Sequence, residues 1–190
     1  AQHRRQPAER QAAIAAATEA VRHTRALIEA DGMAVPLVTG AGTGTFVLEA
    51  ASGVWGELQA GSYLFMDADY AANAASDGTP AFEHALFVKS QVMSLNPAHA
   101  VCDAGHKSHA IDSGMPAVWE PPGLTYASGG DEHGVLRGAH LPALGDTVWL
   151  VPGHCDPTVN LHDWLVGVRG GLAAGRVERL MRVDARGALG

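Results

Sequence analysis

The sequence predicts an α/β unit followed by a mostly antiparallel β domain. Three observations indicate this fold class: a long helical segment near the start, a short β-prone run that leads into a glycine-rich loop, and a succession of short β-prone runs separated by turn residues in the second half. The character of the sequence changes near residues 78–84. We therefore place the first domain at residues 1–80 and the second at residues 81–190.

The first expected element is an amphipathic helix over residues 8–30. Ala, Glu, Gln and Arg predominate there, and Ile14, Val21 and Ile28 recur at helical spacing. Gly32 follows as a typical stop signal. This segment should pack one apolar stripe against the rest of the first domain.

A short β-prone run over residues 35–39 leads into the segment 40–45, which reads Gly-Ala-Gly-Thr-Gly-Thr. Small residues let backbone N–H groups converge on an anion, and threonine hydroxyls add donors. No Gly-Lys-Ser/Thr follows, so the segment is not a P-loop, and a plain tight turn is the alternative interpretation. A second β-prone segment over 57–67 carries Gly-Ser-Tyr in its middle, and a short helix over 69–75 follows it. Two such segments on neighbouring strands would hold one phosphate from both sides, which favours a phosphorylated cofactor.

The second domain contains β-prone runs over residues 85–95, 99–103, 134–137, 146–151 and 164–168. Turn residues separate these runs. Short strands at such spacing are typical of an antiparallel or barrel-like β domain rather than of further βαβ units.

The 190-residue chain is 47% hydrophobic and 17% charged, as expected for a folded globular protein. Its net charge of −7 at pH 7 disfavours a nucleic-acid partner or an anionic membrane surface. Two cysteines are too few for a disulfide framework, and no run reaches the roughly 18 apolar residues of a membrane span. We therefore expect a cytoplasmic protein.

The stretch 152–163 contains the densest set of reactive side chains. If this stretch is extended, His154 and Asp156 point to one face, because strand side chains alternate. An imidazole and a carboxylate suit a divalent ion such as Mn²⁺, Mg²⁺ or Zn²⁺ whose other positions are open to water or substrate. A hydrogen-bonded loop histidine is the alternative, and spacing alone favours it. Cys155 should then face the core, while the neighbouring pair at 162–163 is either a second shell or the start of a strand.

Six motifs follow one another along the chain: Ala1-Gln2-His3, the glycine-rich segment 40–45, the run from Glu57 to Asp67, Cys102-Asp103-Ala104-Gly105, Glu132-His133-Gly134, and the run from Pro152 to Thr158. Together, and in this order, they resemble the D-threonine aldolase family, which shares its fold with eukaryotic-type D-serine dehydratase and alanine racemase. The resemblance covers essentially the whole chain but only the later half of such an enzyme.

The resemblance implies an alanine-racemase-like TIM barrel that holds pyridoxal 5′-phosphate, followed by a β domain that carries the metal site and supports a homodimer. Residues 1–80 would be the last units of the barrel. Carried over position by position, the residues in contact with the cofactor phosphate are Thr43, Gly44, Gly61, Ser62 and Tyr63.

The same resemblance assigns His154 and Asp156 as the ligands of a divalent metal beside the substrate hydroxyl. The D-serine dehydratases have a His-x-Cys spacing at this point, so Asp156 favours an aldolase. The implied activity is the cleavage of D-threonine or a related D-3-hydroxy amino acid to glycine and an aldehyde.

The chain has only two lysines, Lys89 and Lys107, and neither occupies the matching position of the cofactor-binding lysine. The catalytic Schiff-base lysine and the general base are therefore expected upstream of this chain, which we interpret as part of a longer protein. Two alternatives remain open. One is a D-serine or D-3-hydroxyaspartate dehydratase, and the other is a non-catalytic cofactor-binding or dimerisation module.

Overall fold

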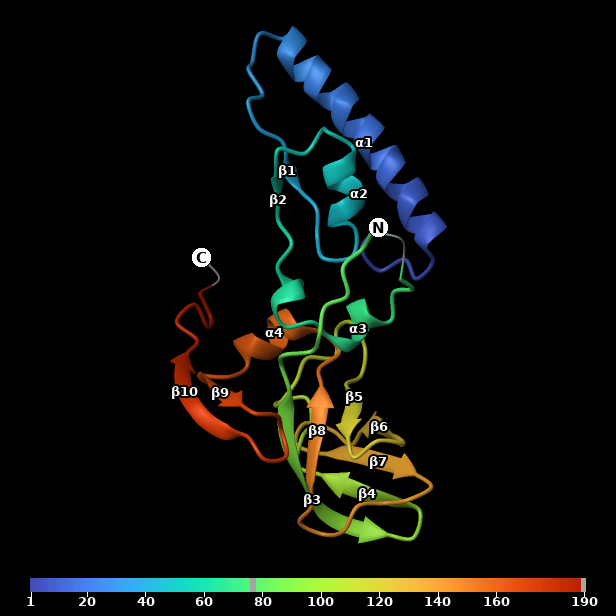
Figure 1. The fold of residues 1–190 in the computed structure, drawn as a ribbon, viewed down its shortest axis with the longest axis vertical. Helices are drawn as coiled ribbons and strands as arrows, with labels where there is room; N and C mark the ends of the chain where they lie inside the picture. Colours follow the sequence, from blue (N-terminus) through green and yellow to red (C-terminus); the bar gives the residue numbers. More distant parts are fainter. Residues whose placement is uncertain (76–77, 189–190) are drawn as a thin grey trace. The chain divides into compact units, whose positions relative to one another are not determined.

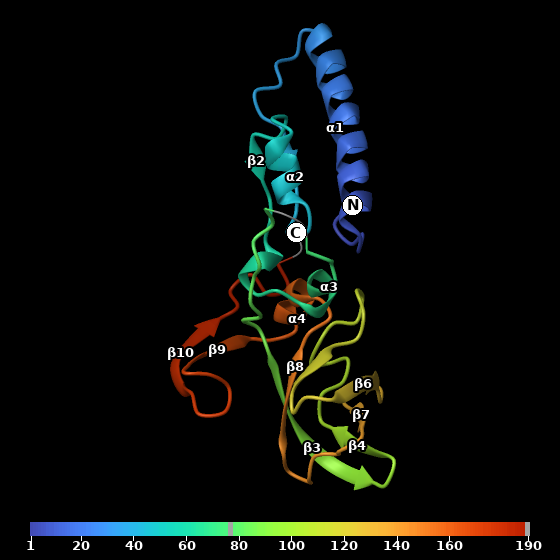
Figure 2. The ribbon, with the colours of Figure 1, turned by 45° about the vertical axis from the view of Figure 1, so that its right-hand side comes forward.

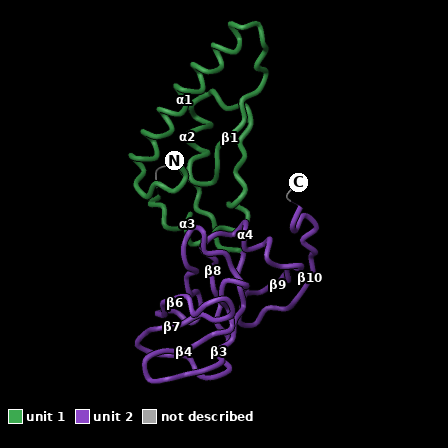
Figure 3. Tube along the Cα trace, turned by 180° about the vertical axis from the view of Figure 1, so that it is seen from behind, with its two compact units in different colours: residues 1–85 green, residues 86–190 purple. Residues whose placement is uncertain are grey.

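The computed structural model describes residues 1–75 and 78–188, and it divides into two compact units, residues 1–85 and 86–190 (Figure 3). Each unit has its own arrangement of helices and strands. Among the residues described, no helix is long and apolar enough to cross a membrane.

The first unit begins with α1 (Pro7–Ala30), close to the helix that the sequence predicts. Its buried residues are Arg10, Ile14 and Thr18, which recur every four positions and so share one face. The guanidinium of Arg10 donates to the carbonyl oxygens of Arg4 at 2.7 Å and Ala74 at 2.5 Å. These bonds satisfy a buried charge and tie α1 to the segments on either side of it in this unit.

A small βαβ unit follows, formed by β1 (Thr39–Gly40), α2 (Phe46–Ala51) and β2 (Glu57–Leu58) (Figure 1). The two strands pair in parallel. The expectation of an α/β unit is thus confirmed, but the strands are much shorter than the predicted runs. Strand β2 ends after two residues, and the chain continues into the 3₁₀ helix η1 (Ser62–Leu64) and the helix α3 (Ala68–Ala71).

The second unit contains a six-stranded antiparallel sheet in the order β5-β8-β3-β4-β7-β6. Its strands are β3 (Val88–Asn96), β4 (His99–Cys102), β5 (Ala117–Glu120), β6 (Leu124–Ser128), β7 (Gly134–Gly138) and β8 (Thr147–Val151). The end strands β5 and β6 also contact each other, so the sheet is nearly closed. The predicted antiparallel, barrel-like β domain is confirmed.

The core of this sheet consists mainly of aliphatic side chains from its strands. Its fully buried members include Val92, Ala100, Leu136, Val148 and Leu150. Strand β3 pairs with β8 through its first half and with β4 through its second, and the register shifts between Val92 and Ser94. This bulge bends β3 from one partner to the next and so curves the sheet.

Two further elements follow β8: the helix α4 (Cys155–Asn160) and an antiparallel hairpin of β9 (Trp164–Arg169) and β10 (Arg176–Arg182). In two views of the ribbon the hairpin lies away from β4, β6 and β7 (Figures 1 and 2). Strands β5, β6 and β10 were not expected from the sequence, and residues 155–160 form helix α4, which was not expected either.

Candidate functional site

The segments expected to bind a phosphate follow the carboxyl ends of the two parallel strands of the first unit. Gly40 of β1 pairs with Leu58 of β2, so the chain leaves both strands on the same side. The backbone N–H of Tyr63 donates to the hydroxyl of the buried Thr43 at 3.0 Å, which joins the two segments directly. The structure therefore brings the two halves of the predicted cradle together, although Tyr63 lies on a 3₁₀ turn and not on a strand.

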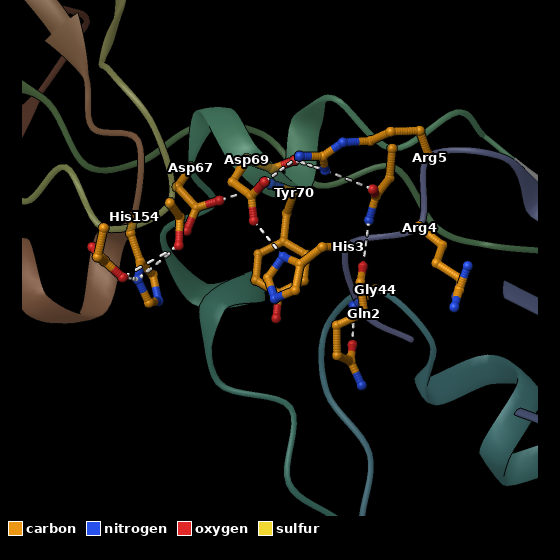
Figure 4. A network of polar contacts seen from close by, with 12 residues as sticks. Gln2, His3, Arg4, Arg5, Gly44, Asp67, Asp69, Tyr70 and His154 are labelled. Atoms are coloured by element: carbon orange, nitrogen blue, oxygen red, sulfur yellow. Dashed lines mark hydrogen bonds and ion pairs between the residues drawn. The ribbon is translucent and has the colours of Figure 1, made fainter. Parts of the chain in front are cut away.

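The glycine-rich segment is packed against the N-terminal residues. The N–H of Gly44 donates to the side-chain oxygen of Gln2 at 2.9 Å (Figure 4). The Gln2 amide donates to Thr45 Oγ1 at 2.6 Å. A Cβ atom at Gly44 would lie 2.3 Å from the Gln2 carbonyl oxygen, so no side chain fits there. At Gly61, by contrast, an added Cβ would meet nothing within 4 Å. Gly61 therefore borders open space, whereas Gly44 packs closely against the backbone of Gln2.

A histidine and a buried carboxylate form a further candidate site in the first unit. Nδ1 of His3 contacts a carboxylate oxygen of Asp69, whose other oxygen contacts the Arg5 guanidinium (Figure 4). The Asp69 side chain is only 6% exposed, whereas that of His3 is 55% exposed. The imidazole also lies on the ring of Tyr70, with centroids 5.3 Å apart. A ring fixed at Nδ1 by a carboxylate can accept or release a proton at Nε2.

The sequence interpretation placed the general base upstream of this chain and gave His3 no role of its own. The pairing of His3 with Asp69 spans 66 positions, so no local spacing could reveal it. The motif Ala1-Gln2-His3 was the only available signal.

The predicted metal ligands lie at the start of α4. His154 is the extended residue just before the helix, and Asp156 is an exposed residue in its first turn. The condition under which both would point to one face of an extended segment is not met, because the chain turns helical at Cys155. The prediction that Cys155 faces the core is confirmed, since this residue is 2% exposed.

His154 is held by the loop between β4 and β5. Its Nδ1 atom lies 2.6 Å from Oδ2 of Asp112, and its side chain is 26% exposed. Burial works against the ionised form of Asp112, but the hydrogen bond and charge of His154 outweigh it and lower the pKa of this carboxyl. Sequence reasoning missed Asp112, which lies 42 positions before its partner.

The donor set at α4 is too small for a closed metal site. Across residues 1–75 and 78–188, no group of three or more His, Cys, Asp or Glu side chains is arranged to hold a metal ion. One imidazole with a free nitrogen and one exposed carboxylate leave most coordination positions to water or substrate, as a catalytic site requires. The neighbouring His162 and Asp163 are engaged elsewhere, with the Ser108 carbonyl at 2.8 Å and with Arg186 at 2.9 Å.

The two lysines have partners of their own. The ammonium of Lys107 pairs with Glu132 at 2.7 Å on the surface, and this hydrogen bond raises the pKa of the lysine. The ammonium of Lys89, on β3, lies 5.8 Å from the centre of the Trp149 ring.

The chain is similar in sequence to known aldolases and to a dehydratase domain. Residues 85–168 match the family model "Putative serine dehydratase domain". The chain is 51% identical over 165 residues to a D-threonine aldolase of Arthrobacter sp, which corresponds to 85% of this chain and 42% of the relative. It is 43% identical over 185 residues to the 3-hydroxy-D-aspartate aldolase of Paracoccus denitrificans (strain Pd 1222), covering 94% of this chain and 47% of the relative.

Solved structures give the same result. The crystal structure of D-threonine aldolase from Filomicrobium marinum superimposes with a TM-score of 0.92 at 48% identity, covering 99% of this chain and 52% of that one. An alanine-racemase-like protein from Idiomarina loihiensis shares the fold at 23% identity, with a TM-score of 0.66 over 78% of this chain and 44% of that one. The chain spans about half the length of the curated relatives it matches. In sequence and in fold, the chain is therefore similar to about half of a D-threonine aldolase.

Proposed function

We propose that the protein containing this chain cleaves D-threonine or a related D-3-hydroxy amino acid to glycine and an aldehyde. The observation that carries this proposal is the 51% identity to a D-threonine aldolase, with 48% identity and a TM-score of 0.92 to the solved structure of another. The second relative, a 3-hydroxy-D-aspartate aldolase, supports the same class of reaction on a related substrate.

Residues 1–80 then form the last units of a TIM barrel that binds pyridoxal 5′-phosphate, and the protein acts as a homodimer. The cofactor supplies an electron sink for the bond that breaks, and a divalent Mn²⁺, Mg²⁺ or Zn²⁺ ion polarises the substrate hydroxyl. The cradle of Thr43, Gly44, Gly61, Ser62 and Tyr63 binds the cofactor phosphate. Two observations support this assignment: the hydrogen bond from Tyr63 N–H to the Thr43 hydroxyl, which joins the two halves of the cradle, and the open space beside Gly61.

His154 and Asp156 hold the metal ion in this proposal. A carboxylate at position 156 suits hard cations such as Mn²⁺ and Mg²⁺ better than a thiolate would. His3, fixed by Asp69, is the group of this chain best arranged to take a proton from a substrate hydroxyl.

A dehydratase is the second candidate function, and the match of residues 85–168 to a serine dehydratase domain favours it. The dehydratase reaction releases ammonia and a keto acid instead of glycine and an aldehyde, so the products separate the two. A non-catalytic cofactor-binding or dimerisation module is the third candidate, and it yields neither product.

The test uses the full-length protein, pyridoxal phosphate and Mn²⁺ with D-threonine and, separately, with 3-hydroxy-D-aspartate. We expect glycine in both cases, and acetaldehyde from D-threonine, with no ammonia. L-threonine serves as the control substrate and should not react. Ammonia and a keto acid would show a dehydratase, and no product from either D-substrate would reject the proposed activity.

A further inference from the structure

His154 has one strong side-chain partner, and the chemistry of that partner fixes the state of the ring. The Nδ1 atom lies 2.6 Å from Asp112 and 3.3 Å from the Ser113 hydroxyl. An ionised carboxylate can only accept hydrogen bonds, so a neutral His154 must carry its proton on Nδ1. The lone pair that could bind a metal is then on Nε2.

The loop that carries Asp112 is attached to the chain around His154 by contacts that do not involve the carboxylate. The hydroxyl of Thr158 donates to the His154 carbonyl at 2.6 Å and accepts from the backbone N–H of Ala110 at 3.1 Å. Thr158 is only 1% exposed, so both bonds are shielded from water. One hydroxyl therefore joins the start of α4 to the loop two residues before Asp112.

A second attachment lies on the other side of Asp112. A Cβ atom at Gly153 would lie 2.1 Å from the carbonyl oxygen of Gly114, so the two backbones touch and only glycine fits at position 153. Residues 110 and 114 are thus both fixed against the segment 153–158. Asp112 lies between these two points. The packed backbone on either side of it therefore fixes its position opposite the imidazole.

Asp112 has no evident structural task of its own. Its side chain is 53% exposed, and its other hydrogen bonds in the described structure come from the Ser113 hydroxyl at 3.3 Å and from its own backbone N–H. A half-exposed pair of this kind contributes little to folding. The contact of Asp112 with Nδ1 does, however, fix the orientation of the His154 imidazole.

We propose that Asp112 is a positioning residue that holds His154 with the proton on Nδ1 and so presents Nε2 to the divalent metal. This inference rests on the proposed function, in which His154 is a metal ligand. Carboxylates that accept from the second nitrogen of a metal-binding histidine fix the ring and increase its basicity, and their loss typically weakens metal binding by roughly 10–100-fold.

The first test measures Mn²⁺ binding by the metal-free, full-length protein, from the electron paramagnetic resonance signal of free Mn²⁺. We expect Asp112→Ala to raise the dissociation constant by about 10–100-fold. Asp112→Asn, which keeps one acceptor oxygen, should have a smaller effect. Asp131→Ala removes an exposed carboxylate from another loop of the same unit and should bind like the parent protein. Equal affinity in Asp112→Ala and the parent protein would overturn the inference.

The second test does not depend on metal at all. Long-range ¹H–¹⁵N correlation spectra of histidine-labelled, metal-free protein distinguish the two tautomers, and His154→Ala identifies the signal. We expect the Nδ1–H form in the parent protein and a shift toward the Nε2–H form in Asp112→Ala. An Nε2–H form in the parent protein would overturn the inference. If His154→Ala bound Mn²⁺ as tightly as the parent protein, the proposed metal site would be rejected. The tautomer spectra would still decide whether Asp112 holds the proton of His154 on Nδ1.

Discussion

The imidazole of His109 is fully buried, and its Nε2 atom lies 3.0 Å from the hydroxyl oxygen of Tyr126. That hydroxyl donates its only proton to the carbonyl oxygen of Ala104 at 2.8 Å. His109 must therefore be the donor in its bond with Tyr126. This chain of two hydrogen bonds connects β6 to the loop between β4 and β5, which also carries Asp112.

Replacement of Tyr126 by Phe should destabilise the protein by about 1–3 kcal/mol. The change removes one oxygen and leaves two buried groups unpaired, the Nε2–H of His109 and the carbonyl of Ala104. Urea unfolding of the full-length protein measures the loss. The exposed Thr125→Val on the same strand is the control and should change stability by less than about 0.5 kcal/mol. Equal stability of the Tyr126→Phe variant and the parent would show that these groups find other partners.

The stability should also fall in mild acid because of His109. Burial, more than the nearby His106, lowers the pKa of His109 below its ordinary value of 6.5, against a raising effect of the Ala110 carbonyl. Below pH 6.5 the unfolded chain therefore binds a proton that the folded chain does not, so this contribution is complete above pH 6.5 and is lost as the pH falls below it. Unfolding free energies at pH 7.5 and 5.5 test this. His109→Gln, which keeps a donor for Tyr126, should show a smaller loss, and an identical pH dependence in both proteins would contradict the assignment.

The parts of the fold that the sequence predicted are those with local patterns. Helix α1 shows the spacing of an amphipathic helix, and strands β3, β4, β7, β8 and β9 are rich in β-prone residues. Strand β10 was missed because charged residues interrupt it: Arg176, Glu178, Arg179 and Arg182. Strands β5 and β6 are short, and pairing with β8 and β7 defines them more than their own composition does.

The candidate sites also differ in how far a local sequence pattern reveals them. The glycine-rich segment 40–45 could be singled out because its residues are contiguous and their small size is itself the signal. The partners Asp69 and Asp112 could not, since each meets its histidine only after the chain has folded across 66 and 42 positions. The geometry at His154 and Asp156 depends on whether Cys155 starts a helix, and the spacing of two residues does not decide that.

The two glycines of the cradle should respond differently to the same substitution. Gly44→Ala forces a methyl group against the Gln2 carbonyl oxygen and should cost about 1–3 kcal/mol of stability. Gly61→Ala meets no atom within 4 Å and should leave stability nearly unchanged, but it should weaken the retention of pyridoxal phosphate, because the methyl group enters the space assigned to the phosphate. Thermal unfolding without cofactor and equilibrium dialysis with it separate the two effects. Full cofactor affinity in Gly61→Ala would remove this position from the cradle.

The pairing of His3 with Asp69 predicts that substitution of His3 lowers turnover without weakening the binding of cofactor or metal. His3→Asn should lower kcat by about 10²–10⁴-fold, because it removes the group that takes the proton. Pyridoxal phosphate and Mn²⁺ should still bind, since neither is assigned to His3. Asp69→Asn should give a smaller reduction and a changed pH profile of kcat, because the ring keeps its place against Tyr70 but loses the carboxylate that holds Nδ1. His23→Asn, on the exposed surface of α1, is the matched control and should retain parental activity. Full turnover in His3→Asn would show that His3 does not take the proton.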